Sequence, residues 1–157
     1  MKKIFSIALL LLFTLPLFSE EVVVKKVVYD LTTGDLKRFE TRLLSGIVAH
    51  KTYYQSKLEE LDVIVVVHGD AYKFFMKDLR RTPYAKEKKL VVTQKELGKR
   101  VIALATQYGV KFLVCKIGTV ERGLERKAFY PFVRFVHNAA IGLIDAQNSG
   151  YAYLPLR

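Results

Sequence analysis

The chain contains 157 residues, with 26 lysines and arginines against 15 aspartates and glutamates, so its formal charge at pH 7 is +11. A positive charge of this size favours anionic partners such as acidic proteins, anionic lipid surfaces or nucleic acid. The sequence contains no helix-turn-helix, zinc-finger or aromatic RNA-binding pattern, so we expect no nucleic-acid partner.

Residues 1–19 have the pattern of a signal peptide, in which Lys2 and Lys3 precede a short apolar run. The run is about 15 residues long and a membrane-spanning helix needs about 20, so the pattern favours a cleaved signal over a permanent anchor. Ser19 is the only small residue near the expected cut, which leaves the cleavage position open by a few residues. We expect a periplasmic protein with a single domain over residues 20–157, held at a membrane only if the signal is retained.

The first half of this domain alternates strand and helix patterns. Val22–Leu31 is apolar and β-branched, and it predicts a strand that ends in a turn. Apolar residues then recur every three or four positions over Leu36–Leu58, which predicts a long amphipathic helix with Asp35 near its N-cap. Asp62–Val67 has no polar alternation, as is typical of a strand buried on both faces, and Ala71–Leu79 predicts a short helix.

The second half continues the alternation after an irregular stretch. Arg80–Thr93 contains a proline and a cluster of charges, and we interpret it as a mobile excursion or a lid. Gln94–Tyr108 is amphipathic and predicts a helix, and Val110–Cys115 predicts a third strand. The remaining predictions are a helical turn at Thr119–Arg126, a strand at Pro131–Val136, a helix at Asn138–Gln147 and a strand at Tyr151–Leu154. Strands that alternate with helices predict an α/β three-layer sandwich around a mainly parallel five-stranded sheet.

Parallel α/β sheets bind their ligands beyond the carboxyl ends of the strands, so the residues that follow each strand are the candidate site. In chain order these are Gly34 and Asp35, then His68, Gly69 and Asp70, then Cys115 and Lys116, and finally His137. The one thiol and two of the three histidines are thus expected at the same edge.

Cys115 is open to two interpretations. A free cysteine often behaves as a small hydrophobic residue that completes a core. Alternatively it is a reactive thiol, favoured here by the cation of Lys116 and by the helical turn predicted to follow. Because the chain has no second cysteine, an internal disulfide is excluded. Persulfide carriage, a mixed disulfide with a partner, or no redox chemistry remain.

The other candidates also carry a structural alternative. His68 is either hydrogen-bonded at a strand end or a group that moves the proton of the thiol, and His137 has the same two interpretations. His50 lies within a helix and is expected to be a surface or packing residue. Asp35 and Asp70 are typical helix-capping residues. No ligand spacing indicates a metal, and Gly34 stands alone without a phosphate-loop pattern, so we expect no metal and no cofactor.

Four segments together resemble the DsrE/DsrF-like family, which includes the sulfur-relay (TusD-like) subunits. They are "VVYDLTTGD", "VIVVVHGDAYKFFMKD", "GVKFLVCKIGTVERGL" and "NSGYAYLPL", in that order along the chain. The resemblance implies a flavodoxin-like fold that assembles into trimers or hexamers. It also implies that a cysteine at a strand end, ahead of an Arg-Gly pair, accepts sulfur as a persulfide. Cys115 occupies that position, ahead of Arg122 and Gly123.

From this resemblance and from thiol chemistry we expect a sulfur carrier. Cys115 would take sulfane sulfur from a donor and pass it to the thiol of a partner protein, with stoichiometric rather than independent catalytic turnover. His68 would assist proton movement, and the cationic surroundings would stabilise the thiolate. The alternative is a non-catalytic oligomeric binding or assembly module in which Cys115 is core packing.

Overall fold

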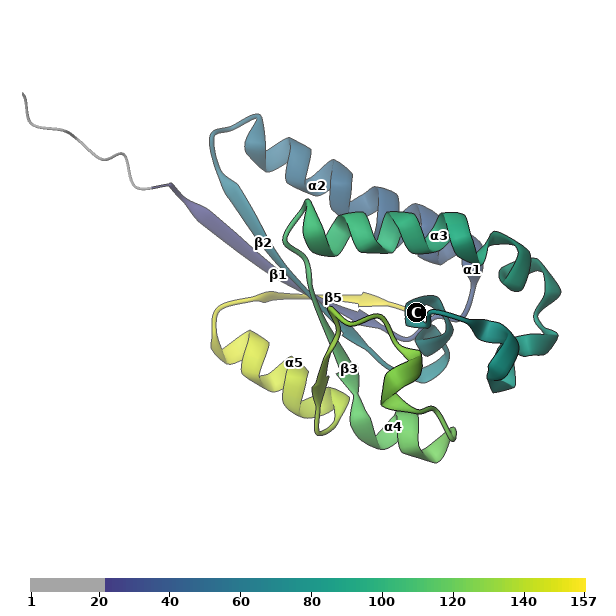
Figure 1. Ribbon diagram of the computed structural model, residues 1–157. Helices are drawn as coiled ribbons and strands as arrows, with labels where there is room; N and C mark the ends of the chain where they lie inside the picture. The colour runs from purple at the N-terminus through teal and green to yellow at the C-terminus, as the bar shows by residue number, and fades with distance from the viewer. Residues whose placement is uncertain (1–21) are drawn as a thin grey trace, which may run out of the picture.

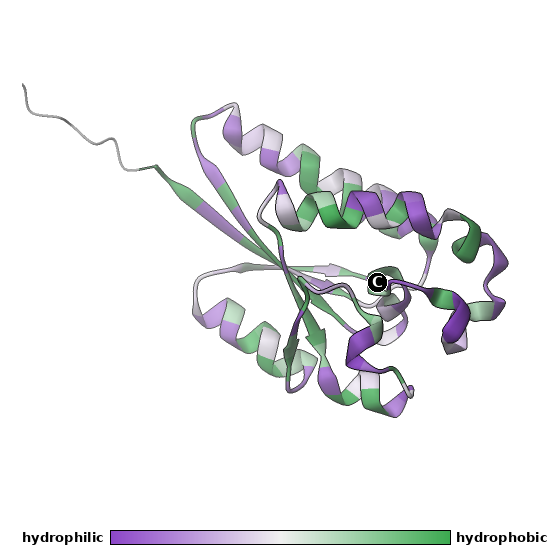
Figure 2. Ribbon diagram, viewed as in Figure 1, coloured by the Kyte–Doolittle hydropathy of each residue, from purple (hydrophilic) through white to green (hydrophobic). Residues whose placement is uncertain are grey.

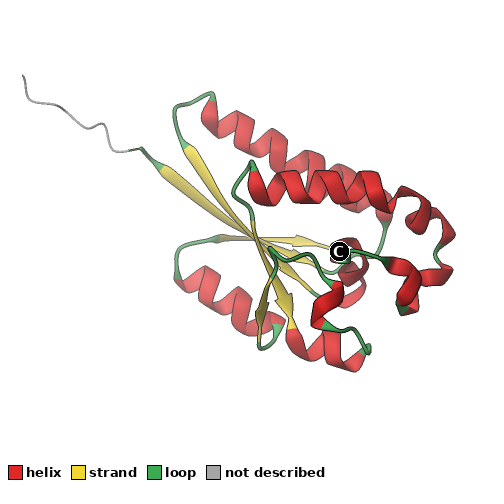
Figure 3. Ribbon diagram, in the orientation of Figure 1, coloured by secondary structure: helices red, strands yellow, loops and turns green. Residues whose placement is uncertain are grey.

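The computed structural model describes residues 22–157, and the predicted signal peptide at residues 1–19 therefore lies outside the described part. One sheet contains all the strands of this part: β1 Val24–Leu31, β2 Glu60–Val67, β3 Lys111–Cys115, β4 Arg134–Val136 and β5 Ala152–Leu156. The strand order is β4-β3-β2-β1-β5, and every neighbouring pair is parallel. Figures 1 and 3 show the strands twisted through the middle of the molecule, between two layers of helices. The predicted α/β sandwich is confirmed.

The helices follow from this strand order. The main ones are α1 Leu36–Arg38, which continues through the π-helical segment η1 Phe39–Ser45 into α2 Gly46–Gln55, then α3 Lys88–Thr106, α4 Lys116–Glu121 and α5 Ala139–Asn148. Crossovers between parallel strands are right-handed, so connections that run in one direction across the sheet place their helices on one face. The step from β4 back to β5 reverses the direction, and α5 accordingly covers the opposite face from α2 and α3 (Figure 1).

The core is divided unequally between the two faces. Under α1–α3 lies the larger cluster, which includes the fully buried Phe39, Leu43 and Ile47 at helical spacing. On the α5 face the buried cluster is small and contains Val28, Val66, Ala146 and Tyr151. In Figure 2 the strands are most hydrophobic where they cross the middle of the sheet, and the helices alternate between hydrophobic and hydrophilic residues. This is the pattern of an amphipathic helix packed on a buried sheet.

Two predicted boundaries are wrong because local contacts end or begin a helix early. The first long helix ends at Gln55, not at Leu58. Leu58 lies beyond the helix with a φ of 60° and is 86% exposed, so it is not part of the apolar face. The segment Arg80–Thr93 is not irregular. It forms the 3₁₀ turns η3 Leu79–Arg81 and η4 Pro83–Lys86, and α3 already begins at Lys88. The buried side chain of Leu90 explains the earlier start.

Three shorter predictions also need correction. The helix expected at Ala71–Leu79 is the 3₁₀ segment η2 Gly69–Phe75, because the chain then turns to pair Met76 with Phe129. The strand expected at Pro131–Val136 is shorter and consists of β4, Arg134–Val136. Just before it, the chain is held at η2, because the N–H of Tyr130 donates to the carbonyl of Phe75 at 3.0 Å. The helical turn expected at Thr119–Arg126 is α4, which starts directly after Cys115. A further 3₁₀ turn, η5, spans Arg126–Ala128.

Within residues 22–157, no helix combines the length and apolar character that crossing a membrane requires.

The packing of α4 on η2 depends on a glycine. A Cβ atom at Gly118 would collide with the hydroxyl of Tyr72, and it would lie 3.2 Å from Cζ of the same ring. Tyr72 is fully buried and cannot move aside without disturbing the core. Only glycine therefore lets α4 lie this close to η2.

We predict that Gly118→Ala lowers the free energy of unfolding by about 1–3 kcal/mol, because overpacking forces neighbouring atoms apart. Gly142→Ala in α5 is the matched control, because its Cβ would lie 3.4 Å or more from Val136 and Val66. There alanine should be neutral or stabilising by up to about 1 kcal/mol through its higher helix propensity. Urea unfolding of both variants measures the difference, and equal effects would show that the Tyr72 contact does not restrict position 118.

Candidate functional site

The carboxyl ends of the strands bring the predicted residues to one edge of the sheet. Val67 pairs with Val114, so the next residues, His68 and Cys115, end neighbouring strands side by side. Because adjacent strands are about 4.8 Å apart, the backbones of His68 and Cys115 are expected to be separated by about this distance. Cys115 also pairs with Val136, the last residue of β4, so His137 follows on the other side. The predicted convergence on one edge is confirmed.

Cys115 lies at the junction between β3 and α4. Its side chain caps α4, because Sγ accepts a hydrogen bond from the N–H of Gly118 at 3.5 Å. The residue is only 7% exposed and contacts the larger core. Its carbonyl oxygen accepts a hydrogen bond from the Tyr72 hydroxyl at 3.2 Å. Cys115 is therefore buried, and contacts with α4 and η2 fix its position.

Tyr72 connects the cysteine to a cation at the surface. The guanidinium of Arg122 lies over the Tyr72 ring at 5.4 Å from its centroid, and it is 4.0 Å from the carboxylate of Asp70. Burial, and secondly contact with Cys115, raises the pKa of Tyr72, so its hydroxyl stays protonated and remains a hydrogen-bond donor. Arg122 and Asp70, both predicted as site residues, are thus brought together around Cys115 by a tyrosine that the sequence interpretation did not include.

His68 takes part in a second polar group. Its Nε2 atom lies 2.6 Å from Oδ1 of Asp30, a carboxylate that is only 6% exposed. The other oxygen, Oδ2, accepts a hydrogen bond from the Tyr153 hydroxyl at 2.6 Å. This bond raises the pKa of Tyr153. The carboxylate fixes the imidazole ring and leaves Nδ1 as its second nitrogen. Among the hydrogen bonds of the described residues, none joins His68 to the thiol.

Sequence reasoning missed Asp30 and Tyr153. Asp30 had a signal, since it is a lone acid inside the apolar stretch "VVYDL", and a buried carboxylate requires partners. Tyr153 had none, because its approach to Asp30 depends on β5 pairing with β1 from the far end of the chain.

The loop after β1 packs against η2, and this accounts for the other predicted residues. A Cβ at Gly34 would lie 2.7 Å from Cβ of Asp70 and 3.1 Å from Nζ of Lys73, so Gly34 allows close approach of the two segments. Asp35 caps α1 by accepting from the N–H of Arg38 at 2.7 Å, as predicted. Gly69 forms the turn after β2 with a φ of 61°.

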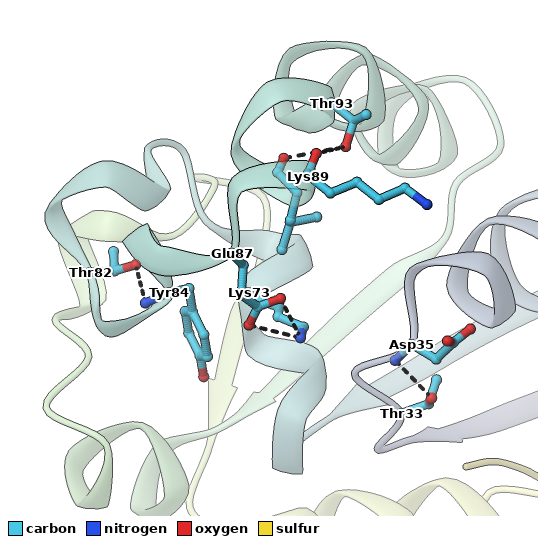
Figure 4. A network of polar contacts seen from close by, with 9 residues as sticks. Thr33, Asp35, Lys73, Thr82, Tyr84, Glu87, Lys89 and Thr93 are labelled. Carbon is cyan, nitrogen blue, oxygen red and sulfur yellow. Dashed lines mark hydrogen bonds and ion pairs between the residues drawn. The ribbon is translucent and has the colours of Figure 1, made fainter.

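Lys73, which lies at this loop contact, also binds the segment Arg80–Thr93 through an ion pair. Its ammonium donates to both oxygens of Glu87 at 3.0 and 2.8 Å, and its side chain is 11% exposed. Figure 4 shows this pair just before α3, close to the loop that holds Thr33 and Asp35. The same segment and the loop after α4 line a cavity of about 430 Å³ that includes Arg81, Thr82 and Gly123.

Lys116 and His137 are both exposed. Lys116 is the first residue of α4, and the carbonyl of His137 accepts a hydrogen bond from the N–H of Ile117 at 3.3 Å. Lys116 is therefore next to Cys115 in the chain, and His137 lies at the end of the neighbouring strand β4. His50 lies apart from them in α2, where its Nδ1 is 2.7 Å from the Tyr29 hydroxyl. Over residues 22–157 no cluster of three or more His, Cys, Asp or Glu side chains has the geometry to hold a metal ion.

Comparison with known proteins relates this arrangement to one family. The sequence model of the DsrE/DsrF-like family matches residues 26–156. An uncharacterized protein of Aquifex aeolicus (strain VF5) is 30% identical over 155 residues, which are 99% of this chain and 64% of the length of that relative. A solved structure of a protein of unknown function from Methanobacterium thermoautotrophicum matches 83% of this chain and 98% of its own at a TM-score of 0.62. At 20% identity this likeness concerns the fold alone. By its match over nearly the whole described domain, the chain belongs to the DsrE/DsrF-like family.

Proposed function

We propose that the protein is a sulfur carrier that holds sulfane sulfur as a persulfide on Cys115. The observation that carries the proposal is the position of this thiol. It ends an inner strand of the sheet, its Sγ accepts a hydrogen bond from the Gly118 N–H at the start of α4, and its carbonyl accepts one from the Tyr72 hydroxyl. A backbone N–H donated to Sγ at the start of a helix stabilises a thiolate or a persulfide anion. Membership of a family that includes sulfur-relay subunits supports the same role.

The proposed transfer needs no net redox agent. The Cys115 thiolate attacks the outer sulfur of a donor persulfide or polysulfide, so that a new S–S bond forms on Cys115 and the S–S bond of the donor breaks. The donor leaves as a thiolate with the electron pair of the broken bond. In the second step an acceptor thiolate attacks the outer sulfur on Cys115, and the Cys115 thiolate is the leaving group. The sulfane sulfur keeps its oxidation state throughout.

The proton of the thiol must leave before the first step. His68 is the nearest predicted base along the strand ends, and Asp30 holds its ring. Nδ1 is the nitrogen that would receive the proton. Because no hydrogen bond joins His68 to Sγ in the described structure, this role requires a local opening around Cys115 that brings the two groups together.

The burial of Cys115 favours a second candidate function. A thiol that is 7% exposed and packed in the core is also what a non-catalytic binding or assembly module would contain. In that case α4 and η2 are structural, and the basic surface recruits an acidic partner. The two candidates differ in whether Cys115 is reached by sulfur donors in the folded protein.

We further propose that the carrier is exported to the periplasm and acts as a homo-oligomer, a trimer or hexamer, with a separate sulfur donor or acceptor protein. The signal-peptide pattern at residues 1–19 supports export. Exposed apolar side chains support self-association, since Ile144 of α5 is 53% exposed and Val120 of α4 is 70% exposed.

We predict that incubation of the folded protein with polysulfide adds one sulfur atom, about 32 Da, to its intact mass, because Cys115 accepts sulfane sulfur. Reduction should remove the addition, and Cys115→Ser should never acquire it. Absence of the adduct in the folded protein, together with full modification after denaturation, would contradict sulfur carriage and support the assembly module.

We predict that His68→Gln and Asp30→Asn slow this sulfur loading by about 100-fold, the lower end of the range for loss of a general base. The deficit should narrow at alkaline pH, where hydroxide removes the thiol proton without help from the imidazole. His50→Gln, a histidine exchange in α2, should leave the loading rate unchanged. Equal rates for wild type and His68→Gln at neutral pH would exclude His68 as the base without excluding Cys115 as the carrier.

A further inference from the structure

A second pocket lies at the β5 edge of the sheet, away from Cys115. It has a volume of about 420 Å³, and its polar lining consists of Tyr29, Arg38, Arg42, His50 and Arg157. The tyrosine comes from β1, the next three residues from the α1-to-α2 helix, and Arg157 directly follows β5. Two strands, β1 and β2, separate β5 from the strand that ends in Cys115. Among the side chains of the lining, only the guanidinium of Arg157 approaches a group of the site described above, the Tyr153 hydroxyl.

The charge of this pocket is unbalanced. Its lining contains three guanidinium groups and no Asp or Glu side chain. Elsewhere in residues 22–157, arginines such as Arg80, Arg100 and Arg122 have an Asp or Glu carboxylate within 4.0 Å, whereas Arg38, Arg42 and Arg157 have no such side-chain partner. Like charges gathered in a concavity repel one another and create a strong positive potential. An anion is the ligand that such a pocket attracts.

Two hydrogen bonds hold the donors of the pocket in place. Nη1 of Arg38 donates to the main-chain oxygen of Arg157, the last residue of the sequence, at 2.7 Å, and this fixes one guanidinium beside the residue that carries another. A fixed guanidinium presents its remaining N–H groups as a planar fork, the geometry that matches the oxygens of a phosphate or sulfate.

The second bond joins Tyr29 and His50, whose Oη and Nδ1 atoms are 2.7 Å apart. Burial raises the pKa of Tyr29 to about 12, so its hydroxyl remains protonated. The bond holds the His50 ring at the wall of the pocket. The three guanidinium groups of the lining are donors only, as a site for an oxyanion requires.

We propose that this pocket binds the phosphate or sulfate group of a small organic anion. Arg38, Arg42 and Arg157 would contact the tetrahedral oxyanion. One water molecule occupies about 30 Å³ in the liquid. The pocket, at about 420 Å³, therefore has room for an organic group beside the oxyanion. Leu154, which is 41% exposed, and Pro155 provide an apolar wall for the organic part. This proposal does not depend on sulfur carriage by Cys115.

Calorimetric titration of the protein with inorganic phosphate, phenyl phosphate and phenyl sulfate at constant ionic strength tests the proposal. We expect one molecule of phenyl phosphate or phenyl sulfate per chain, bound more tightly than inorganic phosphate. Arg42→Gln should weaken phenyl phosphate about 10- to 100-fold, which is the loss of one charge-assisted hydrogen bond. Arg134→Gln removes the same charge from the exposed surface of β4 and should leave the affinity unchanged.

Three results would overturn the proposal. Absence of phenyl phosphate and phenyl sulfate binding would exclude the site. Equal weakening by Arg42→Gln and Arg134→Gln would show diffuse attraction by the net charge. Equal affinity for phenyl phosphate and inorganic phosphate would exclude an organic ligand against Leu154 and Pro155. A melting curve of each variant verifies that it folds.

Discussion

All five strands of the sheet run parallel, and their carboxyl ends must therefore meet at a single edge. This constraint decides where chemistry can occur in the molecule. Residues from four distant parts of the chain, at 34–35, 68–70, 115–116 and 137, reach the same edge because each group lies at or shortly after the end of a strand. The strand order adds a second consequence. Since β5 returns beside β1, Tyr153 can bond the buried carboxylate of Asp30.

The edge is organised around buried polar groups rather than around an open cavity. Asp30 is satisfied by His68 and Tyr153, and Tyr72 is satisfied by the carbonyl of Cys115. A buried polar group without a partner is costly, so these bonds fix the segments that carry them. The bond from Tyr72 also keeps Cys115 buried. Any reaction at the thiol therefore needs a local opening, most directly a movement of α4 relative to η2.

Most of the fold could be predicted from the sequence because its signals are local. Buried strands such as β2 form apolar runs, and the face containing Phe39, Leu43 and Ile47 has helical spacing. One error occurred where a distant contact overrules the local pattern. Residues 71–79 have helical composition, yet the pairing of Met76 with Phe129 ends the 3₁₀ segment at Phe75.

The site was predictable in part for the same reason. Cys115, His68 and Asp70 could be proposed because each follows a strand whose end is visible in the sequence. Tyr72 and Tyr153 could not, since their partners are 43 and 123 residues away along the chain. The close approach of Gly34 to Asp70 and Lys73 is likewise a property of packing and leaves no trace in composition.

Sulfur carriage requires that Cys115 becomes accessible while the rest of the protein stays folded. The most direct measurement is the rate at which a small thiol reagent modifies Cys115 at several urea concentrations below the unfolding transition. Modification through a local opening would proceed at a rate nearly independent of urea, because little surface is exposed. A rate that rises with urea as steeply as global unfolding would mean that the thiol is reached only in the unfolded chain, and it would exclude sulfur carriage on Cys115.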